Sequence, residues 1–230
     1  MTLVSVLDVD PDLGDGIAAE QLEQARRACR AKTLEVRQGE WDPAASQVAA
    51  EDGYGLLVLS GLLCRRVVQG RRYGAELLGP GDLLRPWDRI GEWSSLPVES
   101  SWLVIEDAGL AVLDREFAVC CASFPEVAVA LIRRGLMRSR YMAILFAVVA
   151  ERRIDTRLTM LFWHLADRFG RMRGEWVDIP VPLTHRILSE LVAARRPSVS
   201  TALTKLQDGG ILLRTPEGWQ LHRDSRRSDA

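Results

Sequence analysis

Arginines and short hydroxyl side chains gather near the C-terminal end of the 230-residue chain, in the stretch ARRPSVSTALTK at residues 194–205. Arginine can grip a guanine edge or a phosphate through two parallel hydrogen bonds, and serine and threonine hydroxyls reach bases or phosphates. Proline is tolerated in the first turn of a helix, so Pro197 indicates that Arg195 and Arg196 lie at a helix N-terminus, which itself attracts phosphate. This pattern predicts contact with the backbone and base edges of DNA.

Two helices and a ribbon should position these side chains. Thr184 can cap a first short helix, and its apolar residues recur at helical spacing: Ile187, Leu188, Leu191 and Val192. The turn at 193–195 leads to a second helix that ends at Gly209-Gly210. Its apolar stripe is Val199, Ala202, Leu203 and Leu206, which leaves Ser198, Thr201 and Lys205 on the opposite face. Residues 211–214, a turn at 215–218 and residues 219–221 predict a two-stranded ribbon, so the whole reads as a winged helix-turn-helix.

The charge distribution agrees with this interpretation. The chain as a whole has a net charge of −1, with 47% hydrophobic and 27% charged residues, as is typical of a folded globular protein. Residues 1–150 hold 16 Lys+Arg and 21 Asp+Glu, a net charge of −5, whereas residues 151–230 hold 14 and 10, a net charge of +4. A basic C-terminal part on an acidic body is the pattern of a DNA-binding domain attached to another domain.

Other kinds of chemistry are not predicted. The four cysteines form no CxxC motif, and no Cys, His or acidic cluster has metal-site spacing, so we expect buried free thiols, no metal and no cofactor: Cys29, Cys64, Cys120 and Cys121. No nucleophile motif, phosphate loop or pair of carboxylates accompanies the three histidines, His164, His185 and His222. We therefore do not expect an enzyme.

The residues before 125 show the pattern of a β-rich domain. Residues 1–16 look like a flexible acidic lead without the basic start of a signal peptide, and a helix is predicted over 17–31. Short apolar strands follow with glycine turns between them, including two strands at 102–105 and 110–113 that flank a predicted turn at 106–109. This spacing is typical of a β-sandwich or roll. The longest apolar run, Tyr141 to Ala150, is too short to span a membrane, so we expect a cytoplasmic protein.

A long helical pattern without internal proline covers residues 125–153. Its apolar residues occupy more of the circumference than one core-facing stripe, so the helix can bury one face in its own domain and another against a partner. Gly135 in the middle costs roughly 1 kcal/mol relative to alanine, which suits a close approach of two helices. A further helix is predicted over 154–169, with Asp155 as a candidate cap.

With these elements in place, the chain resembles the Crp/Fnr family of bacterial transcription regulators. The resemblance rests on residues 183–219, on a Gly61 turn between apolar strands, on LGPGD at 78–82 and on LDREF at 113–117. It implies an α+β fold with a cyclic-nucleotide-binding-like β-roll at 1–124, a dimerisation helix at 125–153 and a winged helix-turn-helix at 154–230. It also implies a homodimer on a palindromic double-stranded DNA operator, with RNA polymerase as a further partner and no membrane.

The resemblance implies individual DNA contacts as well. Arg196 and Thr201 match positions that contact bases, and Pro197 replaces a base-reading glutamate, so the half-site should differ from the usual one. Thr184, His185 and Ser198 match positions that contact phosphates, and Arg195 is expected to join them. In such dimers the half-site centres lie one helical turn, about 34–36 Å, apart.

The effector domain departs from the family pattern. Members that bind cyclic AMP hold its phosphate with a Gly-Glu pair and an Arg-Ser/Thr-Ala element. Here these positions read Arg85-Pro86 and Glu99-Ser100, and Met142 stands in place of a hydroxyl near the base. A glutamate repels phosphate, so we expect no cyclic AMP binding.

What the effector domain binds instead is left open. If the insertion at 87–97 shifts the alignment, Arg89 and the pair Gly91-Glu92 could take part, which gives a candidate effector pocket of Arg85, Arg89, Glu99, Ser100 and Met142. The effector itself is unknown. The iron–sulfur cluster of the Fnr branch needs an N-terminal cysteine group, whereas this chain has only Cys29 there.

A second class of function stays open on the sequence alone. A dimeric ligand-sensing or protein-docking module could use its winged helix to contact protein instead of DNA. Salt dependence of binding to duplex DNA separates the two, because phosphate neutralisation makes affinity fall steeply with ionic strength.

Overall fold

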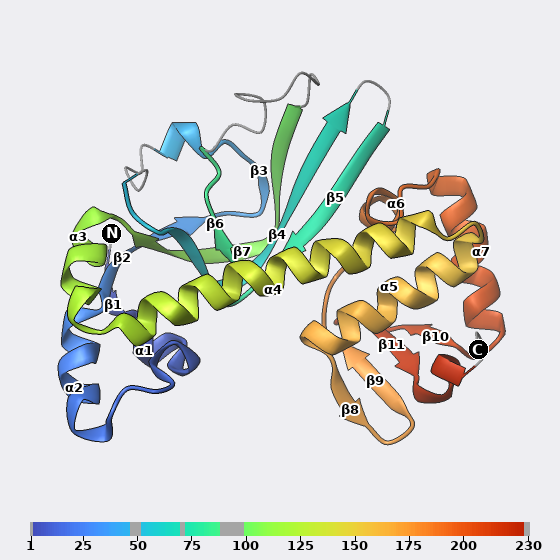
Figure 1. The fold of residues 1–230 in the computed structure, drawn as a ribbon. Coiled ribbons are helices and arrows are strands. Elements are labelled where there is room, and N and C mark those ends of the chain that lie inside the picture. Colours follow the sequence, from blue (N-terminus) through green and yellow to red (C-terminus); the bar gives the residue numbers. More distant parts are fainter. Residues whose placement is uncertain (1, 47–51, 70–71, 88–98, 228–230) are drawn as a thin grey trace. The chain divides into compact units, whose positions relative to one another are not determined.

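The computed structural model describes residues 2–46, 52–69, 72–87 and 99–227 (Figure 1). The chain divides into two compact units, one of residues 1–69 and 76–140 and the other of residues 70–75 and 141–230. The long helix α4, Pro125–Ala150, contributes to both units. It ends three residues before the predicted limit at 153.

An antiparallel sheet forms the body of the first unit. Its strand order is β1-β2-β7-β4-β5, with β3 paired to β7 and β6 paired to β4. The strands are β1 Leu3–Ser5, β2 Arg30–Val36, β3 Gly39–Trp41, β4 Gly55–Gln69, β5 Arg72–Leu78, β6 Leu83–Leu84 and β7 Glu99–Leu113. The remaining elements of this unit are α1 Val6–Val9, η1 Pro11–Gly14, α2 Ala19–Ala28, η2 Ala44–Ser46, α3 Arg115–Cys120 and η3 Cys121–Ser123. The mixed α+β class predicted from the sequence is confirmed.

The predicted turn at 106–109 is wrong, because β7 runs through it as one continuous strand. Glu106 and Gly109 pair with Leu62 and Ser60 of β4. The register of the β4–β7 pairing shifts between Val58 and Leu63 of β4. Gly61 has a φ of +82°, and a side chain on it would collide with the backbone at Asp107. The break expected at Gly61 is therefore a bulge inside a long strand pair, which bends the two strands together.

Residues 2–16 are not the flexible lead that the sequence suggests. Strand β1 pairs with β2, and Val6, Leu7 and Leu13 are buried in the core that also holds the start of α4. The acidic character has a structural role, because the carboxylate of Asp10 accepts a hydrogen bond of 2.8 Å from Arg134 on α4. The contact between Asp10 and Arg134 joins residues 124 positions apart, so local sequence patterns do not reveal it.

Two buried thiols meet in the same core. The Sγ atoms of Cys29 and Cys121 lie 3.0 Å apart, at the ends of α2 and α3. Cys29 and Cys64 are fully buried, as expected, whereas Cys120 is exposed. Asp114 caps α3 by accepting a hydrogen bond from the Phe117 amide at 2.9 Å.

The second unit packs helices against a small sheet. After the end of α4 come α5 Ile154–Phe169, β8 Arg171–Arg173, β9 Trp176–Ile179, α6 His185–Leu191, α7 Arg196–Asp208, β10 Leu212–Arg214, β11 Trp219–His222 and η4 Arg223–Arg227. The strand order is β10-β11-β9-β8, all antiparallel. Fully buried Leu158, Phe162, Leu188, Leu203 and Trp219 bring α5, α6, α7 and the ribbon into one core.

A charged contact fixes α7 against α5. The Asp155 carboxylate accepts hydrogen bonds from Lys205 on α7, at 2.8 Å, and from Arg153. These hydrogen bonds, that from Arg153 above all, hold the pKa of Asp155 well below its usual range. Asp155 lies inside the first turn of α5, which begins at Ile154, and thus ties two helices together instead of capping the helix as predicted. No helix among the described residues is long and apolar enough to cross a membrane.

His164 lies in the core of the second unit, on α5. Burial, with the positive charge of Arg168 nearby, lowers its pKa to about 4. The unfolded chain takes up a proton near pH 6.5 and the folded protein only near pH 4, so stability falls as the pH drops through this window. We expect the free energy of unfolding from urea titrations to be about 2 kcal/mol lower at pH 5 than at pH 8 from this group alone. His164→Leu should remove that part of the slope, and an unchanged slope in the variant would contradict the assignment.

Candidate nucleic-acid interface

The helix-turn-helix predicted from residues 183–209 is present. Thr184 caps α6, with its Oγ1 accepting a hydrogen bond from the Ile187 amide at 3.3 Å. Helix α7 begins at Arg196, with Pro197 in its first turn, and it ends before Gly209. The carbonyl of Ser189 on α6 accepts a 2.9 Å hydrogen bond from the Ala194 amide, which holds the turn between the helices. Thr184 caps α6, Pro197 lies in the first turn of α7 and Gly209 follows its last residue, as the sequence predicts.

The turn between the helices stores a little strain. Ala193 has a φ of +49°, the left-handed region, and it is the one described residue other than glycine with a positive φ. Its side chain is exposed, so packing does not offset the cost, which is about 1–2 kcal/mol for an L-residue.

Substitutions at Ala193 should therefore separate backbone strain from side-chain contact. We expect Ala193→Gly to change the free energy of unfolding by less than about 1 kcal/mol, because relief of strain offsets the extra freedom of the unfolded chain. Ala193→Val should lower it by about 1–2 kcal/mol, because a β-branched residue is strongly disfavoured at this φ. Ala194→Val is the matched control for added bulk. Equal effects of valine at both positions, measured by urea unfolding, would count against the strained turn.

Helix α7 presents one apolar and one polar face. Val199, Ala202, Leu203 and Leu206 are buried, whereas Arg195, Arg196, Pro197, Ser198 and Thr201 are exposed. Within the described part of the chain, neither Arg195 nor Arg196 makes an ion pair or a side-chain hydrogen bond. Two uncompensated guanidinium groups thus stand at the N-terminal end of a helix, where the helix dipole adds to their attraction for an anion.

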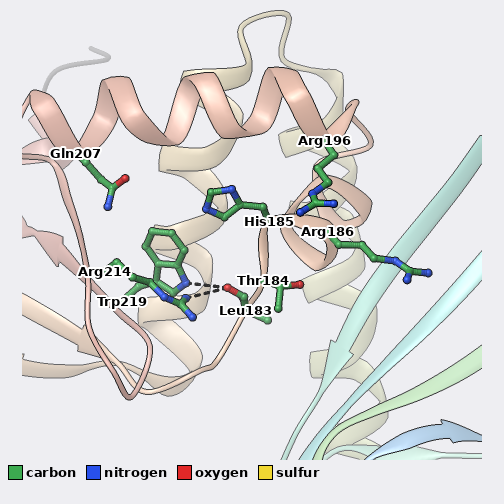
Figure 2. Close-up of a pocket in the computed structure, with 8 residues that line it drawn as sticks. All are labelled: Leu183, Thr184, His185, Arg186, Arg196, Gln207, Arg214 and Trp219. Carbon is green, nitrogen blue, oxygen red and sulfur yellow. Dashed lines mark hydrogen bonds between the residues drawn. The ribbon is translucent and has the colours of Figure 1, made fainter.

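A hollow of about 530 Å³ lies beside this turn, between the start of α6, helix α7 and the ribbon (Figure 2). Its lining residues are Leu183, Thr184, His185, Arg186, Arg196, Gln207, Arg214 and Trp219. The carbonyl of Leu183 accepts hydrogen bonds from Arg214, at 2.9 Å, and from the Trp219 indole, at 3.2 Å. The Arg214 guanidinium also stacks 4.7 Å from the centre of the Trp219 ring. The ribbon therefore brings a third guanidinium to the interface in a fixed orientation.

His185 links the two helices of the motif. Its Nδ1 lies 3.0 Å from the Ser200 hydroxyl on α7. Desolvation, with the positive charges of Arg214 and Arg196, lowers the pKa of His185, so the imidazole is neutral at physiological pH. The hollow therefore owes its positive charge to arginines.

The residues predicted for DNA contact divide into two groups. Thr184, His185 and Arg196 line the hollow, whereas Arg195, Ser198 and Thr201 lie outside it on the exposed face of α7. Thr201 is not fully free, because its hydroxyl donates a 3.2 Å hydrogen bond to the Pro197 carbonyl. Five lining residues were not predicted from the sequence as contacts: Leu183, Arg186, Gln207, Arg214 and Trp219. Arg186 directly follows the predicted phosphate contact His185 and could have been found, whereas Arg214 reaches the site only through the fold of the ribbon.

The described residues of the candidate effector pocket belong to separate elements of the chain. The guanidinium of Arg85 donates a 2.6 Å hydrogen bond to the Gly53 carbonyl and faces the Trp87 ring. Glu99 and Ser100 lie exposed at the start of β7, paired with β4. Met142 belongs to the second unit, and Arg89 and the pair Gly91-Glu92 lie outside the described residues. No cluster of three metal-binding side chains occurs in the described part of the chain.

A buried ion network fills part of the first unit. The Glu76 carboxylate, which is 5% exposed, lies 2.5 Å from Arg65 and 2.6 Å from Arg138. Arg138 also donates a 3.1 Å hydrogen bond to the Leu83 carbonyl. This carboxylate is committed to two guanidinium groups of the protein.

A sheet domain, a long helix and a winged helix-turn-helix with an exposed basic turn define a DNA-binding transcription regulator. Residues 156–223 match the Crp-like helix-turn-helix domain, which confirms the resemblance to the Crp/Fnr family over this part of the chain. None of the curated proteins compared with the chain matches it in sequence.

Solved structures share the fold over most of the chain. A cyclic nucleotide-binding domain containing protein from Listeria monocytogenes EGD-e is 17% identical with a TM-score of 0.66, covering 85% of this chain and 90% of that one. A CooA mutant from Carboxydothermus hydrogenoformans is 14% identical with a TM-score of 0.65, covering 97% and 93%. FixK2 from Bradyrhizobium japonicum is 17% identical with a TM-score of 0.60, covering 86% and 94%. At these identities the likeness concerns the fold.

Proposed function

We propose that the protein acts as a homodimer that binds a palindromic DNA operator and regulates transcription from it. The observation that carries this proposal is the exposed N-terminal end of α7, which presents the guanidinium groups of Arg195 and Arg196 and the hydroxyl groups of Ser198 and Thr201. The functional division that goes with it is an effector domain at 1–124, a dimerisation helix at 125–153 and a DNA-binding domain at 154–230.

Base reading is assigned to Arg196 and Thr201. Arg196 begins α7 and has the reach and the five donors to bind a guanine bidentately in the major groove. Thr201 is also exposed and lies five residues further along the helix, in its second turn. With Pro197 between them, no side-chain carboxylate is available in this turn to accept from a cytosine amino group, so the preferred half-site should be set by these two residues.

Phosphate contacts are assigned to Thr184, His185, Arg195 and Ser198, with Arg214 and Arg186 added from the geometry of the hollow. Arg214 is held by the Leu183 carbonyl and the Trp219 ring, so it can meet a phosphate without losing much conformational freedom. The groups around the hollow are positive or neutral, apart from Glu190, which pairs with Arg186.

The support for a dimer comes from α4. Seven exposed positions on this helix follow each other at alternating intervals of three and four residues, as in a coiled-coil seam: Val129, Ile132, Leu136, Ser139, Ala143, Phe146 and Ala150. The side chains of Val129, Ile132, Leu136 and Phe146 are each more than half exposed. Gly135 beside this seam faces open space, so its missing side chain serves no contact among the described residues. A second copy of the helix would cover the seam and use the small residues for close approach.

The effector domain is proposed not to bind cyclic AMP. Glu99 stands where a phosphate-binding arginine is expected, and Arg85 is committed to the Gly53 carbonyl. Isothermal titration with cyclic AMP and cyclic GMP tests this proposal, and micromolar binding of either nucleotide would overturn it.

The proposed function is tested by selecting duplexes from a random pool and measuring affinity against salt. We expect a palindrome to be enriched. Two or three guanidinium groups per subunit should neutralise about four to six phosphates in the dimer, so log K should fall with log salt at a slope of about −4 to −5. Absence of duplex binding at low salt would instead favour a winged helix that docks protein.

A further inference from the structure

One arginine side chain joins three helices of the second unit. Arg157, in the first turn of α5, donates hydrogen bonds from Nε to the Glu151 carbonyl at 2.5 Å and from Nη1 to the Val192 carbonyl at 3.0 Å. Glu151 directly follows the last residue of α4, and Val192 directly follows that of α6. Arg157 therefore connects the end of the long helix to the end of the first helix of the helix-turn-helix motif.

Both acceptors are carbonyl groups at the C-terminal end of a helix. Such carbonyls have no partner within their own helix and carry a partial negative charge, so a guanidinium group satisfies them well. Arg157 is half-buried, and its guanidinium group is planar and rigid. Two donors of fixed relative position thus hold the ends of α4 and α6 in a fixed relation to each other.

An ion pair attaches the second helix of the motif to the same place. The Asp155 carboxylate accepts hydrogen bonds from Lys205 of α7 and from Arg153, which directly precedes α5. Both helices of the motif are therefore attached to the segment between α4 and α5, α6 through Val192 and α7 through Lys205. Val192 also directly precedes Ala193, the residue with the positive φ in the turn between the two helices.

We propose that Arg157 is a positioning residue for operator binding, which holds the helix-turn-helix motif in one orientation against the last turns of α4 and so sets the separation of the two recognition helices in the dimer. This inference rests on the proposed homodimer on a palindromic operator. Arg157 does not belong to the described residues that line the hollow beside α7, so it acts through the carbonyls of Glu151 and Val192 and not by contact with DNA.

The proposal has a consequence that a purely stabilising contact would not have. Without Arg157, each DNA-binding unit still reads its own half-site. The two units of a dimer, however, no longer meet two half-sites at one fixed spacing, so the advantage of an intramolecular second contact falls. Loss of Arg157 should therefore weaken binding to the palindrome and leave binding to a single half-site unchanged.

The test measures the affinity of the full-length protein for the selected palindrome, for palindromes with one base pair added or removed between the half-sites, and for a duplex with a single half-site. We expect Arg157→Met, which keeps the apolar stem and removes both donors, to bind the selected palindrome about tenfold or more weakly. Its preference among the three spacings should fall below about threefold, and its affinity for the single half-site should change by less than about twofold.

A matched control and a second variant complete the design. Arg152→Met removes an exposed arginine from the same segment and should leave all affinities unchanged. Cooperative thermal unfolding establishes that Arg157→Met is folded. If it is not, Arg157→Lys takes its place with the same expected losses, because one ammonium group does not reproduce the fixed geometry of the two guanidinium donors.

A loss on the selected palindrome that is absent for the single half-site and absent in Arg152→Met supports the positioning role. An unchanged spacing preference, or an equal loss on the palindrome and the single half-site, would overturn it and leave the proposed operator binding intact. Absence of duplex binding by the unchanged protein would instead overturn the proposed function, and this proposal with it.

Discussion

The double variant Leu136→Glu/Phe146→Glu is expected to be a monomer at concentrations where the unchanged protein is a dimer. Both side chains lie on the proposed seam of α4 and are more than half exposed in the single chain, so the substitutions should not disturb the core of either unit. Each buried apolar side chain contributes about 1.5–3 kcal/mol, and a twofold interface doubles the loss, so the interface should weaken by about 6 kcal/mol or more. Added glutamates facing each other across the axis increase the loss. Sedimentation equilibrium measures the change directly.

Loss of the dimer should carry through to DNA. A palindrome is bound tightly only if two recognition helices are presented together, because the second contact is then intramolecular. We expect the double variant to bind the operator at least 100-fold more weakly than the unchanged protein, with an affinity similar to that for a single half-site. Val119→Glu on α3 is the matched control, because Val119 is also exposed and lies off the seam. A double variant that remains dimeric would refute the proposed interface.

Arg196→Ala should cost about 1–3 kcal/mol of affinity for the selected operator, a loss of roughly 5- to 150-fold. The reason is geometric, since Arg196 is the first residue of α7, is exposed, and has no competing partner among the described side chains. The loss should be confined to duplexes that carry the preferred base at one pair in each half-site. Competition between the operator and single-base variants measures both the size and the position of the effect.

Comparing Arg195→Ala with Arg196→Ala distinguishes a phosphate contact from a base contact. Arg195→Ala should weaken all duplexes about equally and make the salt slope shallower by about two units for the dimer, one for each subunit, because it removes a phosphate contact. Arg171→Ala, on the exposed strand β8, controls for the loss of one positive charge in the same unit. If Arg196→Ala weakened every sequence equally, Arg196 would be a phosphate contact and the base assignment would be wrong.

The parts of the fold that were predictable are those fixed by local physical chemistry. Thr184 caps a helix, Pro197 opens one and Gly209 ends one, and each effect acts within a few residues. The two helices of the winged helix-turn-helix could therefore be predicted from the sequence with nearly correct bounds. The same reasoning predicted the long helix α4, whose apolar residues occupy more of the circumference than one core-facing stripe. Several of these residues are exposed in the structure.

The failures have a common physical cause, which is contact between distant residues. The stretch 106–109 contains acidic residues and a glycine, as turns do, but pairing with β4 keeps it extended. The first residues look acidic and irregular, yet Arg134 on α4 provides the partner for Asp10. In the interface, Arg214 is thirty-one residues from Leu183, whose carbonyl holds it, so no local pattern could place it there.

Pro197 bears on the thermodynamics of operator binding. Its ring fixes one backbone dihedral, and the turn that it occupies is the one proposed to meet DNA. Folding has already restricted this turn, so little further ordering accompanies association. The same ring removes an amide hydrogen from the start of α7, which transfers anion recognition from the backbone to the guanidinium groups. Operator recognition should thus be closer to rigid docking than to coupled folding, with discrimination between sequences expressed mainly in the dissociation rate.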